Sequence, residues 1–136
     1  MSAKVFFDTN VLLYAYDRHD PAKQRRALDL IATHRVGIVV STQVLQEFFV
    51  GATGKLGIPD LEAKEIIRAW SRFEVVGIDP PRINEAIDIR ILNRLSFWDA
   101  LILAAASSAQ CATLLSEDLN NGQIIDGVRV KNPFAR

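Results

Sequence analysis

Short apolar runs alternate along this chain with longer stretches in which apolar residues recur every three or four positions. The short runs are typical of buried strands, and the longer spacing is typical of amphipathic helices. The predicted strands cover residues 3–8, 37–41, 73–78, 112–116 and 128–131. The predicted helices cover residues 10–17, a stretch that starts at 21, and then 42–55, 59–70, 80–95 and 96–110. Strands that alternate with helices predict right-handed crossovers and an α/β fold with a mostly parallel sheet, covered on both faces.

Two of these helices have a predicted buried side. Asp20 and Pro21 supply an N-cap and a first-turn proline for one of them. The buried face predicted for this helix consists of Ala27, Leu28, Ile31 and Ala32. The stripe predicted for the helix over 42–55 consists of Val44, Leu45, Phe48 and Phe49.

Composition limits the class of protein. Apolar residues make up 49% of the 136 residues and charged residues 24%, a globular balance that predicts one domain over residues 1–136. The longest uninterrupted apolar run covers 100–106, well short of the roughly 20 residues that span a bilayer. Asp8 interrupts the only early apolar stretch, so no signal peptide is expected. The single cysteine, Cys111, forms no internal disulfide and favours a cytoplasmic location, with no membrane partner.

Net charge is zero, with 16 basic and 16 acidic residues, which excludes the strongly basic character of a nucleic-acid coat protein. A nucleic-acid enzyme remains compatible with this balance, because the local distribution of charge matters more than the sum. No glycine-rich phosphate loop, dinucleotide fingerprint or convincing serine or cysteine triad is present.

Two acids stand near strand ends. Asp8 ends the first predicted strand, and Asp118 follows the fourth by two residues. If these strands are neighbours, their ends lie roughly 4.8 Å apart. Metal ions that work in pairs lie about 3.5–4 Å apart, so this spacing is compatible with a shared cation site. Glu117 precedes Asp118 directly and is an alternative to it.

Two further acids lie on predicted helices. Asp99 interrupts a helix that has almost no polar face, where an unpaired charge is costly. Its spacing from Ser96 also fits a capping box, and both interpretations hold together because a first-turn acid also points toward the carboxyl edge of the sheet. Glu47 lies off the apolar stripe of its helix, and taken alone it is typical of a solvated position.

Four carboxylates in one cleft repel each other. A pair about 5 Å apart costs roughly 3 kcal/mol at an effective dielectric constant of 20. Such groups either take up protons or hold cations. Oxygen ligands without histidine or thiolate favour Mg²⁺ or Mn²⁺ over zinc, and these ions support phosphodiester hydrolysis.

Four stretches, in this order and spacing, resemble the PIN-domain ribonucleases, and among them the VapC-type toxins of toxin–antitoxin pairs. They are FFDTNVLL, LQEFF, SFWDALILAAA and LLSEDLNNGQ. The resemblance covers essentially the whole chain and implies a PIN-like fold with a central five-stranded parallel sheet flanked by helices. It also implies a Mg²⁺- or Mn²⁺-dependent endoribonuclease that leaves 5′-phosphate and 3′-hydroxyl ends. By resemblance the metal-binding acids are Asp8, Glu47, Asp99 and Asp118, and the supporting residues are Thr9, Asn10 and Ser116.

The resemblance also implies partners. They are an RNA substrate, a cognate antitoxin that lays a helix or tail across the groove, and a second copy of the chain. The stretch over 53–70 is one candidate for the dimer contact, although an amphipathic helix pair there is equally typical of the core. Arg18, Arg25, Arg26 and Arg94 are either contacts to the RNA backbone or ordinary surface residues. The rival function is a catalytically silent PIN-like binding module, and a non-toxin RNA-processing nuclease is a further alternative.

Overall fold

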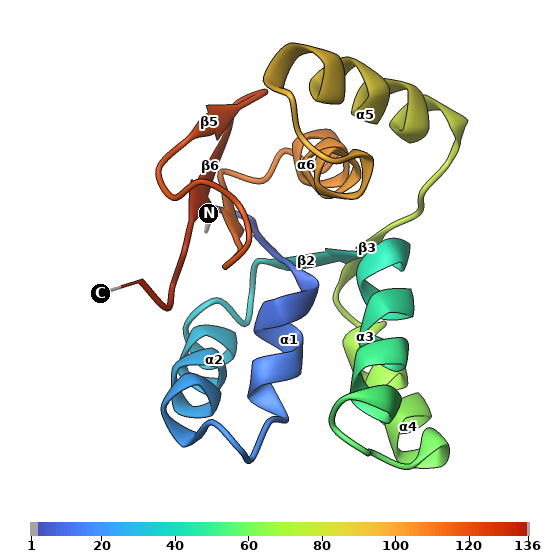
Figure 1. Ribbon diagram of the computed structural model, residues 1–136, viewed down its shortest axis with the longest axis vertical. Coiled ribbons are helices and arrows are strands. Elements are labelled where there is room, and N and C mark those ends of the chain that lie inside the picture. Colours follow the sequence, from blue (N-terminus) through green and yellow to red (C-terminus); the bar gives the residue numbers. More distant parts are fainter. Residues whose placement is uncertain (1–2, 136) are drawn as a thin grey trace.

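The computed structural model describes residues 3–135 and has a central sheet between two groups of helices (Figure 1). The strands are β1 Val5–Phe7, β2 Ile38–Ser41, β3 Glu74–Val76, β4 Thr113–Leu115, β5 Ile124–Ile125 and β6 Val128–Lys131. The helices are α1 Thr9–Ala15, α2 Pro21–Thr33, α3 Thr42–Gly54, α4 Asp60–Trp70, α5 Pro80–Asn93 and α6 Phe97–Ser108. Figure 1 shows α5 and α6 on one side of the sheet and α1 to α4 on the other. The predicted α/β class is confirmed.

The sheet has the strand order β3-β2-β1-β4-β6-β5. The five predicted strands are present and run parallel. The structure adds β5, which pairs antiparallel with β6 across the turn Asp126-Gly127, where φ is 48° and 80°. Positive φ at both central residues suits the tight hairpin turn that Asp-Gly favours. This dipeptide between apolar residues was therefore a readable signal for the edge strand that the sequence analysis missed.

The strand order reverses next to β1. The chain runs from β1 out to β2 and β3 on one side and returns to β4 on the other side of β1. Phe7 at the end of β1 stands opposite Leu115 at the end of β4. Ligands of open parallel sheets bind beyond the carboxyl ends of the strands at such a reversal. Asp8 and Ser116, the residues that follow Phe7 and Leu115, therefore lie at the position where a ligand is expected.

Polar side chains cap the helices where the sequence predicts. Asp20, Asp79 and Ser96 each accept a hydrogen bond from the backbone N–H three residues on. These bonds satisfy N–H groups that have no partner inside the helix. Local sequence therefore determines where α2, α5 and α6 begin.

The hydrophobic core surrounds α6, whose residues from Ala100 to Ala106 are all buried. The stripe on α3 is buried at Val44 and Phe48 and only partly buried at Leu45 and Phe49. No helix within residues 3–135 is long and apolar enough to cross a bilayer.

The buried face predicted for α2 is partly wrong. Ala27 is buried and Ile31 partly buried, but Leu28 is 49% exposed and Ala32 is also exposed. Leu30 is buried instead, and the ring of His34 meets Phe7 edge-on at 6.2 Å. The buried stripe of this helix, which packs against α1, therefore consists of residues three and four positions apart, 27, 30, 31 and 34, and turns away from Leu28 and Ala32.

Candidate metal centre at the carboxyl edge of the sheet

The four predicted acids come from four segments of the chain. Asp8 directly follows β1, Glu47 lies on α3, Asp99 lies in the first turn of α6, and Asp118 lies in the loop after β4. The charges of Asp118 and Glu47 raise the pKa of both Asp8 and Asp99, so these two acids lie within electrostatic reach of the other two. We refer to these four side chains as the acidic pocket.

Asp8 is the most deeply buried member, at 5% exposed, and it caps α1. The Thr9 N–H donates to its Oδ1 and the Ser116 hydroxyl to its Oδ2, both at 2.7 Å. Burial raises the pKa of Asp8 to about 6, although the two hydrogen bonds lower it. The buried carboxylate is thus held in place by neutral donors, and no lysine or arginine in the described part of the chain forms an ion pair with it.

Thr9 connects Asp8 to Glu47. Its N–H donates to Asp8, and its hydroxyl donates to Glu47 Oε1 at 2.7 Å. The second Glu47 oxygen, Oε2, accepts from the Gln43 side-chain amide at 3.4 Å. No sequence pattern singled out Gln43, and its spacing of four residues before Glu47 on one helix is the only signal that places it there. Glu47 is exposed but has a donor on each oxygen.

Asp99 lies next to the helix cap predicted for Ser96. The Ser96 hydroxyl accepts from the Asp99 N–H at 3.1 Å, so Ser96 caps the helix. Burial raises the pKa of the Asp99 carboxyl, the Ser96 hydroxyl lowers it, and the charges of Asp118 and Glu47 raise it again. The acid therefore shares the first turn of α6 with the cap and still faces the acidic pocket.

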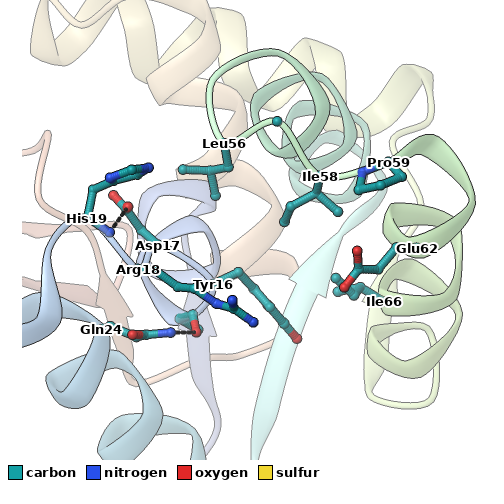
Figure 2. A pocket seen from close by; sticks show the side chains of 12 residues that line it. Tyr16, Asp17, Arg18, His19, Gln24, Leu56, Ile58, Pro59, Glu62 and Ile66 are labelled. Carbon is teal, nitrogen blue, oxygen red and sulfur yellow. Dashed lines mark hydrogen bonds between the residues drawn. The ribbon is translucent and has the colours of Figure 1, made fainter.

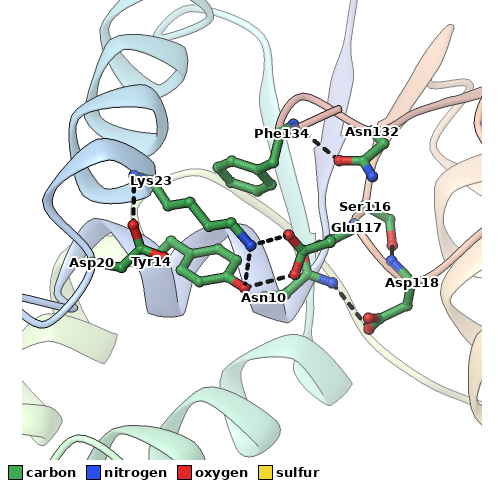
Figure 3. Close-up of polar contacts among 9 residues, drawn as sticks. All are labelled: Asn10, Tyr14, Asp20, Lys23, Ser116, Glu117, Asp118, Asn132 and Phe134. Carbon is green, nitrogen blue, oxygen red and sulfur yellow. Dashed lines mark hydrogen bonds and ion pairs between the residues drawn. The ribbon is translucent and has the colours of Figure 1, made fainter. Parts of the chain in front are cut away.

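Asn10 and Ser116 hold Asp118. The Asn10 amide donates to Asp118 Oδ2 at 3.0 Å, and the Asp118 N–H donates to the Ser116 hydroxyl at 3.2 Å (Figure 3). Ser116 therefore contacts both Asp118 and Asp8. The three residues predicted to support the site, Thr9, Asn10 and Ser116, each form a hydrogen bond with at least one of the four acids.

Glu117 has different surroundings from its neighbour Asp118. The Tyr14 hydroxyl donates to Glu117 Oε1 and the Lys23 ammonium to Oε2, both at 2.6 Å (Figure 3). Burial would raise the pKa of Glu117, but the hydrogen bonds from Lys23 and Tyr14 bring it below its usual value. Both oxygens of Glu117 are thus engaged, which favours Asp118 over Glu117 as the fourth member of the pocket.

No lysine or arginine between residues 3 and 135 forms an ion pair with any of the four acids. Among the described residues, the donors to Asp8, Glu47 and Asp118 are backbone N–H, hydroxyl and amide groups. An all-oxygen donor set of this kind fits Mg²⁺ or Mn²⁺. As placed, residues 3–135 contain no group of three or more His, Cys, Asp or Glu side chains arranged to hold an ion. The chemistry of the donors fits a divalent cation, although the four carboxylates as placed within residues 3–135 do not form a complete ion site.

One hollow lies at this edge, and another lies at the C-terminal end of α1. One, of about 510 Å³, is open and is lined by Thr9, Asn10, Leu13, Gln46, Glu47, Val50, Gly51 and Asp118. The other, of about 340 Å³, lies between the turn after α1 and the turn after α3, and its lining includes Arg18 and His19 (Figure 2). The second hollow contains none of the four acids. The lining of the first includes two of the four acids, Glu47 and Asp118, together with the apolar side chains of Leu13 and Val50.

Comparison with known proteins identifies the family of the chain. A family model described as PIN domain matches residues 5–123. A search of curated proteins by sequence found no match.

Similar solved structures include three that belong to toxin–antitoxin systems or are toxins. A toxin–antitoxin complex from Klebsiella pneumoniae has 21% identity and a TM-score of 0.74, with 96% of this chain and 98% of that chain covered. The sarcin–ricin-loop-cleaving toxin VapC20 of Mycobacterium tuberculosis has 20% identity and a TM-score of 0.72, with 85% and 92% covered. DNA-bound VapBC from Salmonella typhimurium has 20% identity and a TM-score of 0.71, with 97% and 99% covered. At 20–21% identity, these similarities show a shared fold and no more.

Proposed function

This chain belongs to the PIN domain family, and from that premise we propose that it is a Mg²⁺- or Mn²⁺-dependent endoribonuclease that hydrolyses RNA phosphodiester bonds. The observation that carries the proposal is the acidic pocket, four carboxylates from four segments that have no basic partner within residues 3–135. Such a cluster is tolerable when a cation neutralises it. The solved VapC20 toxin, which cleaves the sarcin–ricin loop, supports RNA as the substrate class.

Each acid has a proposed role. Asp8, Asp99 and Asp118 would hold the cation, and Glu47 would either hold it as well or accept the proton of the attacking water. A bound divalent cation supplies positive charge to the phosphate and lowers the pKa of a water molecule. Thr9 and Ser116 hold the oxygens of Asp8, and Thr9 also orients Glu47. Because these donors lie on short segments that follow β1 and β4, they would keep the carboxylates at the carboxyl edge of the sheet, where the cation is expected. The expected products are a 5′-phosphate and a 3′-hydroxyl.

We also propose that the chain is the toxin of a toxin–antitoxin pair and inhibits translation in the cytoplasm. Several structural neighbours are toxin–antitoxin complexes, which supports a protein antitoxin as partner. The open hollow beside Glu47 and Asp118 has Leu13 and Val50 in its wall. It therefore offers an apolar surface next to acids that form no ion pair within residues 3–135. An antitoxin segment with apolar residues and one basic side chain would complement it.

The dimer and the domain extent remain predictions. The family model covers residues 5–123, and a single PIN domain over 1–136 extends beyond it at both ends. Light scattering of the purified chain measures the oligomeric state directly. A mass of twice 15.1 kDa is expected for the homodimer.

A cleavage assay on a mixed RNA pool tests the nuclease proposal. The wild-type chain is expected to cut RNA with Mn²⁺ or Mg²⁺ and to stop when EDTA is added. Asp99→Asn is expected to abolish cleavage, whereas Asp88→Asn, the same change at an exposed position on α5, is expected to preserve it. An inactive wild-type chain would favour the silent binding module.

The role of the nuclease is tested in cells. A toxin is expected to arrest growth when expressed alone, and Asp99→Asn is expected not to. Growth that continues despite cleavage in vitro would favour an RNA-processing nuclease.

A further inference from the structure

Gln43 is a buried amide that touches two elements of the acidic pocket at once. It lies in the first turn of α3 and is 5% exposed. Its Nε2 donates to Glu47 Oε2 at 3.4 Å and to the backbone carbonyl of Trp98 at 3.2 Å. Trp98 directly precedes Asp99 on the first turn of α6. One side-chain amide therefore joins the helix that carries Glu47 to the helix that carries Asp99.

The other end of the same amide is left without a partner. Gln43 Oε1 is buried and accepts no hydrogen bond within residues 3–135. The opposite orientation of the amide would place its carbonyl oxygen against Glu47 Oε2 and the Trp98 carbonyl, three acceptors with no donor among them. The observed orientation is therefore the favourable one, and the unpartnered oxygen is inherent to it.

A buried carbonyl without a partner lowers the stability of a fold. A methionine has nearly the same length as glutamine and would pack in the same space without an orphaned oxygen. Stability therefore does not explain why an amide occupies this position. Its contacts with Glu47 and with the Trp98 carbonyl do explain it, because both connect it to helices that carry members of the acidic pocket.

We propose that Gln43 is a positioning residue, which ties the Glu47 carboxylate to the first turn of α6 and so sets the separation of Glu47 and Asp99. Thr9 holds one oxygen of Glu47 from α1, and Gln43 holds the other. Without Gln43 the Glu47 side chain is restrained at one oxygen only, and the two acids approach a cation less often in the right geometry. The inference rests on the proposed function, because it concerns the affinity of that site for a divalent cation.

The test compares Gln43→Met with Gln24→Met. Gln24 donates to the Ala15 carbonyl at 3.2 Å on the far side of α1, so its variant loses a similar amide bond away from the acids. Thermal unfolding in EDTA, amide NMR spectra of the metal-free protein, and Mn²⁺ binding by calorimetry are measured for both variants and for the wild type. Gln43→Asn, which keeps the amide but shortens its reach, serves as a third variant.

We expect Gln43→Met to unfold at the wild-type temperature or above it and to bind Mn²⁺ about 10-fold more weakly. In its NMR spectrum, the amide signals of the first turn of α6 are expected to shift. Gln24→Met is expected to leave both the Mn²⁺ affinity and these amide signals at wild-type values. Wild-type Mn²⁺ affinity in Gln43→Met, or unmoved amides in α6, would overturn the positioning role while leaving the nuclease proposal intact. Unfolding at a lower temperature with unchanged affinity would show a structural role instead. Absence of Mn²⁺ binding by the wild type would overturn both proposals.

Discussion

Glu117 and Asp118 are adjacent in the loop after β4, carry the same charge, and have opposite surroundings. Glu117 contacts Lys23 and Tyr14, which lower its pKa despite partial burial. Asp118 turns toward Asn10 and the other acids, and its charge raises the pKa of Asp8 and Asp99. The fold therefore neutralises the acid that joins the loop to α1 and α2, and it leaves the acidic pocket without a basic partner. A pocket that retains this electrostatic cost is the expected place for a ligand of opposite charge.

Loss of Asp8 is expected to have the largest effect on the pocket. Asp8→Asn keeps a good helix cap and nearly the same shape but removes the buried negative charge. Cleavage of RNA with Mn²⁺ is expected to fall on the order of 1000-fold, because a lost cation ligand raises the barrier by several kcal/mol. Rates of cleavage of one defined RNA by wild type and variant measure this. If Asp8→Asn retained a tenth or more of the wild-type rate, Asp8 would not be a ligand of the cation.

The adjacent acids offer a matched pair of substitutions. Asp118→Asn is expected to lower cleavage on the order of 100-fold, and Glu117→Gln to leave it within about threefold of wild type. Both changes remove one negative charge from the same loop. They differ in that Asp118 belongs to the acidic pocket, whereas Glu117 contacts Lys23 and Tyr14. Single-turnover cleavage rates distinguish them. A reversed order of the two effects would make Glu117 the fourth acid.

The raised pKa of Asp8 predicts a pH-dependent stability of the metal-free protein. The folded state keeps the Asp8 proton up to about pH 6, whereas the unfolded chain loses it near the ordinary value of 3.8. Stability should therefore fall as the pH rises through this interval, and Asp8→Asn should remove the penalty. The variant is expected to gain about 3 kcal/mol over the wild type at neutral pH and little at pH values below the interval. Denaturant unfolding in EDTA across pH measures the gain, and an equal difference at all pH values would contradict it.

The cluster of Tyr14, Lys23 and Glu117 is expected to contribute less free energy than the change at Asp8, and to affect stability without affecting cleavage. Lys23 and Glu117 side chains are 34% and 26% exposed, so solvent screens their ion pair. Lys23→Met is expected to cost about 1 kcal/mol of unfolding free energy, and the added change Glu117→Gln to restore part of it. Urea unfolding of the single and double variants measures this cycle. A loss of cleavage larger than the loss of folded protein would show that the two clusters are functionally coupled.

Much of the fold was predictable because local patterns determine it. The caps at Asp20, Asp79 and Ser96 mark where three helices begin, and the apolar runs mark all five parallel strands. The Asp126-Gly127 turn was also a local signal, and it was overlooked. The buried side of α2 differs from the prediction because apolar residues occur on two adjacent stripes, and packing against α1 and Phe7 selects one of them.

The candidate acids were predictable in part, and their surroundings were not. Strand ends and the family resemblance point to Asp8 and Asp118, but nothing local shows that Lys23, 94 positions before Glu117, pairs with it. Gln43 was also invisible, since its role depends on contact with Trp98, 55 positions away. Such contacts follow from how the helices pack, and one sequence does not display that packing.

Anomalous X-ray diffraction from crystals grown with Mn²⁺ tests the central claim most directly. The account predicts an anomalous peak within coordination distance of Asp8 and Asp99, with Asp118 as a further ligand and the Glu117 side chain still bound to Lys23. Crystals that show Mn²⁺ bound elsewhere, with Asp8, Glu47 and Asp118 still hydrogen-bonded to Thr9, Gln43, Asn10 and Ser116 as they are here, would contradict it.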